Sequence, residues 1–344
     1  MRALVLDVPG STPQVRDIPA PEAPPGGVVL QVEAAGLCRS DWHAAVGHDA
    51  TVAFPHVPGH ELVGRVLSVG EGVSRWRVGD RVTSPFVCGC GHCQWCEAGQ
   101  SQVCPDQTQP GFTHFGAFAE QVVLHAADHN LVGVGEGLPA EAVVPLGCRF
   151  ATAFRGLRQR AQLHAGELVA VIGCGGVGLS AVMIAAALGA RVIAVDISPR
   201  ALELAQRHGA ERAVLTAGLD PQASADAIIA ATGERPAVTV DALGLEATLE
   251  TALQSLAPLG RHVQIGLFAA PPVTALPRII GQELSLLGSH GMASGGYGEL
   301  LEMVRDGRLR PQDLVTASIG LEEAGAALMA MGDAPPAGIT IIRP

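Results

Sequence analysis

One stretch, residues 167–196, constrains the fold more than any other part of the chain. Residues 167–173 form an apolar run typical of a β-strand, 176–188 have a helical pattern, and 191–196 form a second β run. A strand–helix–strand unit of this length pairs its strands in parallel through a right-handed crossover. The alternation continues in further helical and β runs at 199–208, 220–231, 237–243, 246–257, 261–267 and 283–288. The sequence therefore predicts an α/β domain with a doubly wound parallel sheet.

The first part of the chain has a different pattern. Its apolar runs are short and separated by glycine and proline, at 3–6, 28–32, 62–69 and 78–82. Short, closely spaced strands of this kind indicate a small β-barrel or sandwich. The 344 residues also suit two domains better than one. We expect one domain at 1–148, with 291–344 packing back onto it, and a second at 149–290.

Composition and charge exclude several classes of protein. Apolar residues make up 48% of the chain and charged residues 16%, which excludes intrinsic disorder. The net charge of −11 and the lack of any basic run argue against nucleic acid as a partner. The longest apolar run, 179–190, is shorter than the roughly 20 residues of a membrane span. Without a signal-peptide pattern at the start, the expected location is the cytoplasm, where thiols stay reduced.

Four of the eight cysteines lie within fifteen residues. Cys90, Cys93, Cys96 and Cys104 have the spacing Cys-x2-Cys-x2-Cys-x7-Cys. Four thiolates in one loop can surround a tetrahedral zinc ion completely, which indicates a structural rather than a catalytic metal. An iron–sulfur cluster is the alternative, although the bacterial ferredoxin run has three residues before its last cysteine, not seven.

A second candidate metal site is spread along the chain. Cys38, His60 and Cys148 supply two thiols and one imidazole, and three such ligands leave a fourth zinc position open for water or substrate. Taken one at a time these residues are weak signals, because a lone cysteine is more often part of a core. Spacing alone leaves both interpretations open.

The glycine pattern Gly173-x-Gly175-x-x-Gly178 lies between the first β run and the first helical pattern of the α/β region, with Gly176 and Val177 inside it. Such glycines permit a tight turn and close approach of a dinucleotide pyrophosphate to the helix N-terminus. Asp196 ends the next β run, where a carboxylate binds the adenosine ribose 2′-hydroxyl and repels a 2′-phosphate. NAD is therefore favoured over NADP, although Arg200 nearby weakens that preference.

Taken together and in this order, these motifs make the chain resemble the zinc-dependent medium-chain dehydrogenase/reductase family, in particular its alcohol dehydrogenases. The resemblance covers essentially the whole length. It implies a GroES-like β-barrel catalytic domain, a Rossmann domain, two zinc ions per chain (one catalytic, one structural) and a homo-oligomer, either tetramer or dimer. The implied reaction transfers a hydride between NAD and a primary or secondary alcohol, or a carbonyl compound in reverse. A polyol or amino-alcohol dehydrogenase of the same family is the alternative.

The resemblance also implies roles for individual residues. Cys38, His60 and Cys148 resemble the catalytic zinc ligands. Other residues are similar to the family positions that support the metal ligands, relay the proton, contact the cofactor and line the substrate pocket. By this resemblance Asp41 orients His60, Glu61 approaches the metal during ligand exchange, Ser40 and His43 carry the substrate proton, Arg39 contacts the cofactor pyrophosphate, and Trp42, Phe86 and Phe112 line the substrate pocket. For these three aromatic residues, an ordinary place in the core is the alternative.

Overall fold

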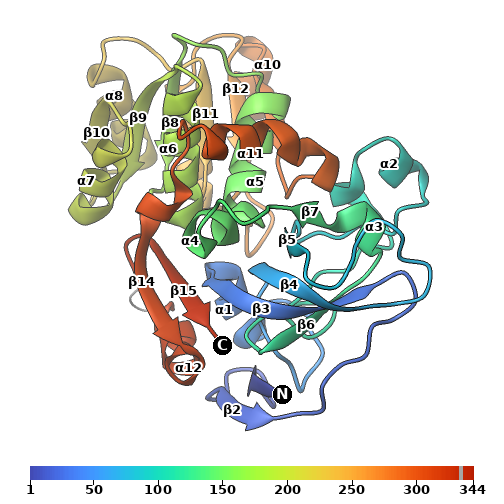
Figure 1. Cartoon of the computed structure of the whole chain (residues 1–344). Helices are drawn as coiled ribbons and strands as arrows, with labels where there is room; N and C mark the ends of the chain where they lie inside the picture. The colour runs from blue at the N-terminus through green and yellow to red at the C-terminus, as the bar shows by residue number, and fades with distance from the viewer. Residues whose placement is uncertain (333–335) are drawn as a thin grey trace. The chain divides into compact units, whose positions relative to one another are not determined.

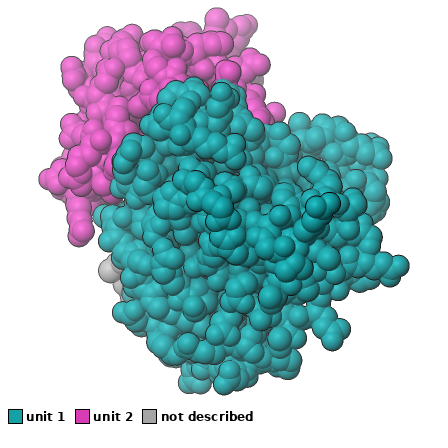
Figure 2. Space-filling model, viewed as in Figure 1, with its two compact units in different colours: residues 1–151, 291–344 teal, residues 152–290 magenta. Residues whose placement is uncertain are grey.

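The computed structural model describes residues 1–332 and 336–344. The chain divides into two compact units (Figure 2). Unit 1 comprises Met1–Ala151 and Gly291–Pro344, and unit 2 comprises Thr152–His290. Across these described residues, no helix has both the length and the apolar character that crossing a bilayer would require.

Unit 1 is built on a seven-stranded sheet that joins the two ends of the chain (Figure 1). Its order is β14(Val315–Gly320), β15(Ile339–Arg343), β3(Val28–Leu37), β4(Glu61–Val69), β5(Arg81–Thr83), β7(Val132–Gly133), with β6(Gln121–Leu124) also paired to β3. β15 pairs with β3 in antiparallel register, so the last segment of the chain completes the sheet of the first. A separate hairpin-like sheet pairs β1(Arg2–Val5) with β2(Gln14–Asp17).

The helices of unit 1 are short, and the core lies between them and the sheet. They are α1(Arg39–Ala45), α2(Gln94–Glu97), η1(Ser101–Val103), α3(Ala127–Asn130), α4(Ala140–Val143), η2(Val144–Leu146), α5(Arg149–Phe154, which runs into unit 2), η4(Ser294–Gly296), α11(Tyr297–Arg305), η5(Pro311–Leu314) and α12(Leu321–Ala330). Leu4, Leu30, Leu62, Phe118 and Ile342 are fully buried in one apolar cluster. This cluster draws on both sheets and on α12, and thereby fixes β3 and β4, whose ends carry candidate ligands.

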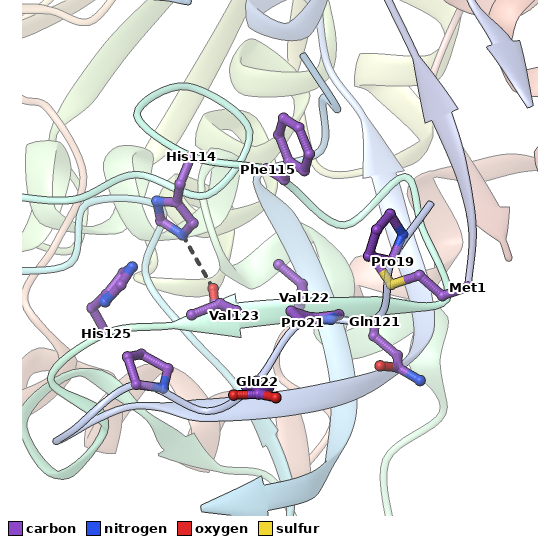
Figure 3. A pocket seen from close by; sticks show the side chains of 11 residues that line it. Met1, Pro19, Pro21, Glu22, His114, Phe115, Gln121, Val122, Val123 and His125 are labelled. Carbon is purple, nitrogen blue, oxygen red and sulfur yellow. Dashed lines mark hydrogen bonds between the residues drawn. The ribbon is translucent and has the colours of Figure 1, made fainter. Parts of the chain in front are cut away.

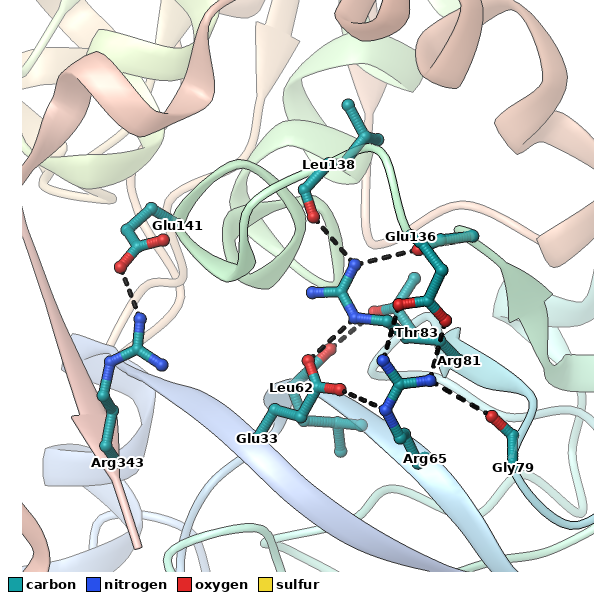
Figure 4. A network of polar contacts seen from close by, with 11 residues as sticks. Glu33, Leu62, Arg65, Gly79, Arg81, Thr83, Glu136, Leu138, Glu141 and Arg343 are labelled. Carbon is teal, nitrogen blue, oxygen red and sulfur yellow. Dashed lines mark hydrogen bonds and ion pairs between the residues drawn. The ribbon is translucent and has the colours of Figure 1, made fainter.

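A network of ion pairs ties β3, β4 and β5 to the loop that follows β7 (Figure 4). Glu33 accepts ion pairs from Arg65 at 3.0 Å and from Arg81 at 2.8 Å. Arg65 also forms a two-pronged contact with Glu136, and Arg81 donates to the carbonyls of Gly135 and Leu138. The Arg81 side chain is nearly buried, so this pairing compensates for a desolvated charge.

Unit 2 contains a six-stranded, wholly parallel sheet (Figure 1). Its order is β10(Arg212–Leu215), β9(Arg191–Asp196), β8(Leu168–Ile172), β11(Val238–Asp241), β12(Arg261–Gln264), β13(Ser285–Gly288). The helices are η3(Arg155–Arg160), α6(Gly176–Ala187), α7(Pro199–Arg207), α8(Pro221–Ala230), α9(Glu246–Ser255) and α10(Leu276–Gly281). The predicted doubly wound parallel sheet is confirmed, and the strand order reverses between β8 and β11, where such folds bind ligands.

Local sequence explains the elements that matter most for unit 2. The Ser198 hydroxyl accepts the Ala201 amide as the N-cap of α7, and Pro199 occupies its first turn, where no amide is required. α6 is apolar on all sides because it is buried against β8, β9 and β11. The strand β10 and the helix α10 were not predicted from the sequence: each is short, and α10 has no buried residue to impose a periodic pattern.

Candidate metal centres and dinucleotide turn

Three separate segments of unit 1 bring Cys38, His60 and Cys148 together. Cys38 follows β3 and precedes α1, His60 directly precedes β4, and Cys148 directly precedes α5. One ligand atom from each lies within 4.8 Å of the other two, and all three residues are buried. The antiparallel register of β3 and β4 places Gly36 opposite Glu61, which holds Cys38 and His60 at the same end of the sheet.

Asp41 fixes the orientation of the histidine in this cluster. Its buried carboxylate accepts hydrogen bonds from His60 Nδ1 at 2.8 Å and from the amides of Cys38 and Gly59. With Nδ1 donating, the neutral ring presents a bare lone pair at Nε2. Nε2 is buried and hydrogen bonds to no group in the described chain. An unpaired imidazole nitrogen beside two thiols is the donor set that a catalytic zinc ion prefers, so the residues present fit this metal.

The two thiols of this cluster differ in acidity. A hydrogen bond from Cys148 lowers the pKa of Cys38, and the same contact raises the pKa of Cys148. Cys38 is therefore the first of the two to lose its proton. Both must be deprotonated to bind a metal, so binding releases protons from this site.

The predicted relay residues, Ser40 and His43, lie on α1. Ser40 Oγ is 3.8 Å from Cys38 Sγ, beside the ligand cluster. His43, one turn further along, is exposed, and its Nδ1 lies 2.9 Å from Nδ1 of His48, which is also exposed. His48 was not predicted from the sequence. The Arg39 guanidinium lies over the Trp42 ring at 5.5 Å, so these two predicted residues contact each other.

Two of the three predicted pocket aromatics lie beside the ligands. The rings of Phe86 and Phe112 are 5.8 and 5.2 Å from the His60 ring, and both side chains are nearly buried. Trp42 instead packs against His43 and against the main core of unit 1. The position of Trp42 agrees with the core alternative as well as with a pocket wall.

Glu61 and Arg149 form a buried ion pair next to the ligand cluster. Glu61 Oε2 lies 3.2 Å from Arg149 Nη1, and Glu61 Oε1 accepts the Arg149 backbone amide at 3.0 Å. Burial raises the pKa of Glu61 to about 7, although the Arg149 charge opposes the shift. The sequence did not predict a role for Arg149. The sequence feature that could have indicated such a role is the position of Arg149 as a single cation in the otherwise largely apolar run that follows Cys148.

The four cysteines of the loop converge as their spacing suggests. The Sγ atoms of Cys90, Cys93, Cys96 and Cys104 all lie within 4.8 Å of one another. Four sulfurs around a zinc ion at about 2.3 Å are separated by roughly 3.8 Å, and the Cys93–Cys104 distance is 3.7 Å. We call residues 88–108 the cysteine lobe, because Cys88 and Thr108 exchange backbone hydrogen bonds at its base.

Neighbouring residues hold the cysteine lobe in this conformation. The Asn130 side chain both accepts from and donates to the backbone of Gly89, at 2.9 and 2.8 Å. Gly89 itself leaves room for sulfur, since a Cβ there would lie 2.7 Å from Cys96 Sγ. Burial raises the pKa of Cys104 to about 12, whereas the Cys96 amide lowers the pKa of Cys93 to about 7. Cys88 is buried and outside the cluster, as a packing residue.

In unit 2, the glycine-rich turn connects β8 to α6. Gly173 has a φ of +88°, and a Cβ on Gly178 would lie 1.7 Å from the Gly173 carbonyl oxygen, so both positions require glycine. Gly175 caps α6 without a side chain, and Gly176 and Val177 begin the helix. Asp196 Oδ2 accepts the Cys174 amide at 2.6 Å, and Oδ1 accepts the Ser198 amide at 2.8 Å. The carboxylate is therefore fixed at the end of β9.

Unit 1 also contains a pocket with a different set of lining residues (Figure 3). It has a volume of about 490 Å³, and its wall is mainly apolar. His114 is one of its polar residues, but its Nε2 donates to the Val123 carbonyl and burial lowers its pKa to about 4, so the ring is neutral near pH 7. None of the residues predicted to bind metal, cofactor or substrate lines this pocket.

Comparisons with known proteins agree with this arrangement. Residues 24–135 match the family description "Alcohol dehydrogenase GroES-like domain", and residues 176–306 match "Zinc-binding dehydrogenase". The chain is 32% identical to the NAD-dependent alcohol dehydrogenase of Sulfurisphaera tokodaii over 95% of each chain. The alcohol dehydrogenase from Thermus sp. ATN1 superposes with a TM-score of 0.90, at 32% identity over 100% of this chain and 99% of that one.

A third similar protein was solved with NADP. It is a zinc-binding dehydrogenase from Sinorhizobium meliloti solved with NADP bound, with a TM-score of 0.87 and 25% identity over 100% of this chain and 99% of that one.

The family matches and the two full-length relatives confirm the GroES-like and Rossmann-like domains expected from the sequence. The chain belongs to the zinc-dependent medium-chain dehydrogenase/reductase family of alcohol dehydrogenase type and is an oxidoreductase of that family.

Proposed function

We propose that this oxidoreductase transfers a hydride reversibly between NAD and a primary or secondary alcohol, with the aldehyde or ketone as the oxidised partner. The observation that carries the proposal is the buried cluster of Cys38, His60 and Cys148, with its unpaired Nε2. Three protein ligands leave a position for a substrate oxygen. A zinc ion held there would supply the Lewis acid that lowers the pKa of a bound alcohol.

The proton and the substrate would be handled by residues around this cluster. Ser40 would accept the hydroxyl proton of the alcohol; its Oγ lies 3.8 Å from Cys38 Sγ. His43 is exposed and can release that proton to water, directly or through its contact with His48. Phe86 and Phe112 would exclude water from the carbon that loses the hydride, since their rings flank His60.

We propose NAD as the cofactor, bound at the turn from Gly173 to Gly178. The amides at the start of α6 suit the pyrophosphate, because Gly175 offers no capping side chain and a Cβ added there would meet open space. Asp196 would bind the ribose hydroxyls. Arg39 remains a proposed pyrophosphate contact.

We also propose that the protein is a homo-oligomer. The strand β13 forms one edge of the parallel sheet in unit 2, and it carries no charged residue. Leu286 on this strand and Ile280 on α10 are exposed. Uncharged, apolar strand edges favour pairing with another chain.

The proposed function is tested by metal content together with turnover. We expect two zinc ions and no iron per purified chain, and NADH formation with at least one member of a panel of primary, secondary, polyol and amino alcohols. One zinc ion per chain together with no turnover of any alcohol in the panel would contradict the catalytic site. About four iron atoms per chain would contradict the assignment of zinc to the cysteine lobe.

A substitution at Asp196 tests the nucleotide preference. We expect Asp196→Gly to lower the preference for NAD, measured as kcat/KM with NAD divided by kcat/KM with NADP, by about tenfold or more. The reason is that the variant lacks the charge that repels a 2′-phosphate. Asp196→Asn is the matched variant: it can still accept the Cys174 amide but carries no charge. A ratio unchanged in both variants would contradict the role of Asp196.

A further inference from the structure

One buried arginine contacts all three segments that carry the proposed catalytic ligands. Arg149 directly follows Cys148 in sequence. Its Nη2 donates to the carbonyl of Leu37, the residue before Cys38. Its Nη1 pairs with the carboxylate of Glu61, the residue after His60. The side chain is 4% exposed, so the guanidinium is a desolvated cation in the wall of the cluster.

The Glu61 carboxylate is held in one place by two neighbours. Oε1 accepts the Arg149 backbone amide at 3.0 Å, and Oε2 forms an ion pair with Arg149 Nη1 at 3.2 Å. Neither Oε2 nor Nη1 makes a hydrogen bond within the described residues, so the attraction between these two atoms is one of charge. On the other side lies the backbone of Gly36, where an added Cβ would be 2.4 Å from Oε2. The glycine therefore makes the space in which the carboxylate lies against β3, and the arginine holds it there.

The charges of the cluster explain why a cation is needed at this point. When a metal is bound, the thiolates of Cys38 and Cys148 are buried anions, and the acidic side chains of Asp41 and Glu61 are buried beside them. A carboxylate buried without a partner binds a nearby metal ion readily, because carboxylate oxygen is itself a zinc ligand. The ion pair with Arg149, with 3.2 Å between Oε2 and Nη1, offers Glu61 an alternative partner.

We propose that Arg149 is a positioning residue that holds Glu61 back from the open coordination position of the catalytic metal. The proposal rests on the proposed function, since it assumes a metal at Cys38, His60 and Cys148. With the ion pair intact, the fourth position is available to a substrate oxygen. Without it, the Glu61 carboxylate takes that position and competes with substrate.

Cobalt(II) in place of zinc makes the coordination visible. Its d–d absorption bands are strong in four-coordinate sites and weaken when a fifth ligand binds or the geometry departs from tetrahedral. Imidazole is the probe for the open position. The cysteine lobe adds a constant background that does not respond to imidazole, and the cobalt-loaded Cys148→Ala variant measures this background.

We expect Arg149→Met to retain cobalt but to show an altered d–d spectrum and about tenfold or more weaker imidazole binding. Turnover of the zinc-loaded variant should fall by about 10- to 100-fold, as with other outer partners of metal ligands. The double variant Arg149→Met/Glu61→Gln should recover the parent spectrum and imidazole affinity, because the competing anion is removed. Arg81→Met, which breaks another nearly buried arginine–glutamate pair in the same unit, should leave both readouts unchanged.

Two results would overturn the proposal. The first is an Arg149→Met variant whose cobalt spectrum and imidazole affinity equal those of the parent. The second is an Arg149→Met variant that loses the metal, together with a double variant that does not bind it again. The second result would indicate that Arg149 has only a structural role. If Arg149→Met does not fold, Arg149→Gln decides, because glutamine keeps polar donor groups but not the charge that pairs with Glu61: a spectrum and affinity equal to those of the parent then contradict the proposal. Failure of the proposed function itself would give a different result: the cobalt spectrum of the parent protein would then not change when imidazole is added.

Discussion

Replacing Cys148 with alanine is expected to abolish alcohol turnover while leaving the affinity for NAD largely intact. Loss of one thiolate leaves only Cys38 and His60 in the buried cluster, and two protein ligands do not make a catalytic zinc site. We expect kcat to fall by more than about 100-fold. This exceeds the largest loss expected when a residue that only supports a metal ligand is altered. The proposed cofactor turn belongs to unit 2, whereas the substituted residue belongs to unit 1.

Three measurements on Cys148→Ala separate this expectation from general damage. Zinc per chain should fall from two to one, kcat should fall below detection, and the Kd for NAD measured by titration should change by less than about threefold, or under 1 kcal/mol. Cys88→Ala is the matched control, because Cys88 is a buried free thiol of the same unit that lies outside both cysteine clusters. Full activity in Cys148→Ala would overturn the ligand assignment.

The fold of unit 2 could be predicted because its signals are local. The central strands of the parallel sheet, β8 and β9, are apolar runs, and β9 was predicted with the bounds Arg191–Asp196 that the structure shows. The elements that were missed are those without such a signal. β10 has only one buried residue among four, and α10 has none, so burial imposes no pattern on their sequences.

The two metal clusters differed in how far the sequence could define them. The cysteine lobe lies within one short loop, so its spacing alone predicted that four sulfurs could meet. Cys38, His60 and Cys148 span more than a hundred residues, and their meeting depends on the register of β3 with β4 and on the start of α5. Without the family resemblance, spacing could not distinguish these residues from buried packing residues.

Arg149 shows what single-residue reasoning cannot recover. Its partners, Glu61 and the Leu37 carbonyl, are 88 and 112 residues away along the chain. A lone arginine in an apolar run indicates a buried ion pair, because a buried cation needs a partner. The sequence does not say which of 33 acidic residues supplies it. Only the folded chain, which brings the residue after Cys148 against the start of β4, identifies the pair.

The second large effect is expected on stability, from Cys93→Ser in the cysteine lobe. Within residues 88–108 the described elements are one turn of α2 and the short η1, so the metal and the Asn130 contacts hold most of this segment. Loss of a structural metal belongs to the few changes that cost about 4 kcal/mol or more. In a unit of this size that corresponds to a fall in Tm of roughly 8–16 °C.

Calorimetry and metal analysis would test the Cys93→Ser expectation, and comparison with Cys148→Ala makes the test specific. Both variants should retain one zinc ion per chain, but with opposite consequences. Cys93→Ser should lose thermal stability and amide protection across residues 88–108 while keeping a measurable kcat at room temperature, because the substrate-binding ligands are intact. Cys148→Ala should lose turnover with a much smaller fall in Tm. An unchanged Tm in Cys93→Ser would contradict a structural metal, since a closed four-thiolate site has no other contribution to make than to stabilise the segment that it holds.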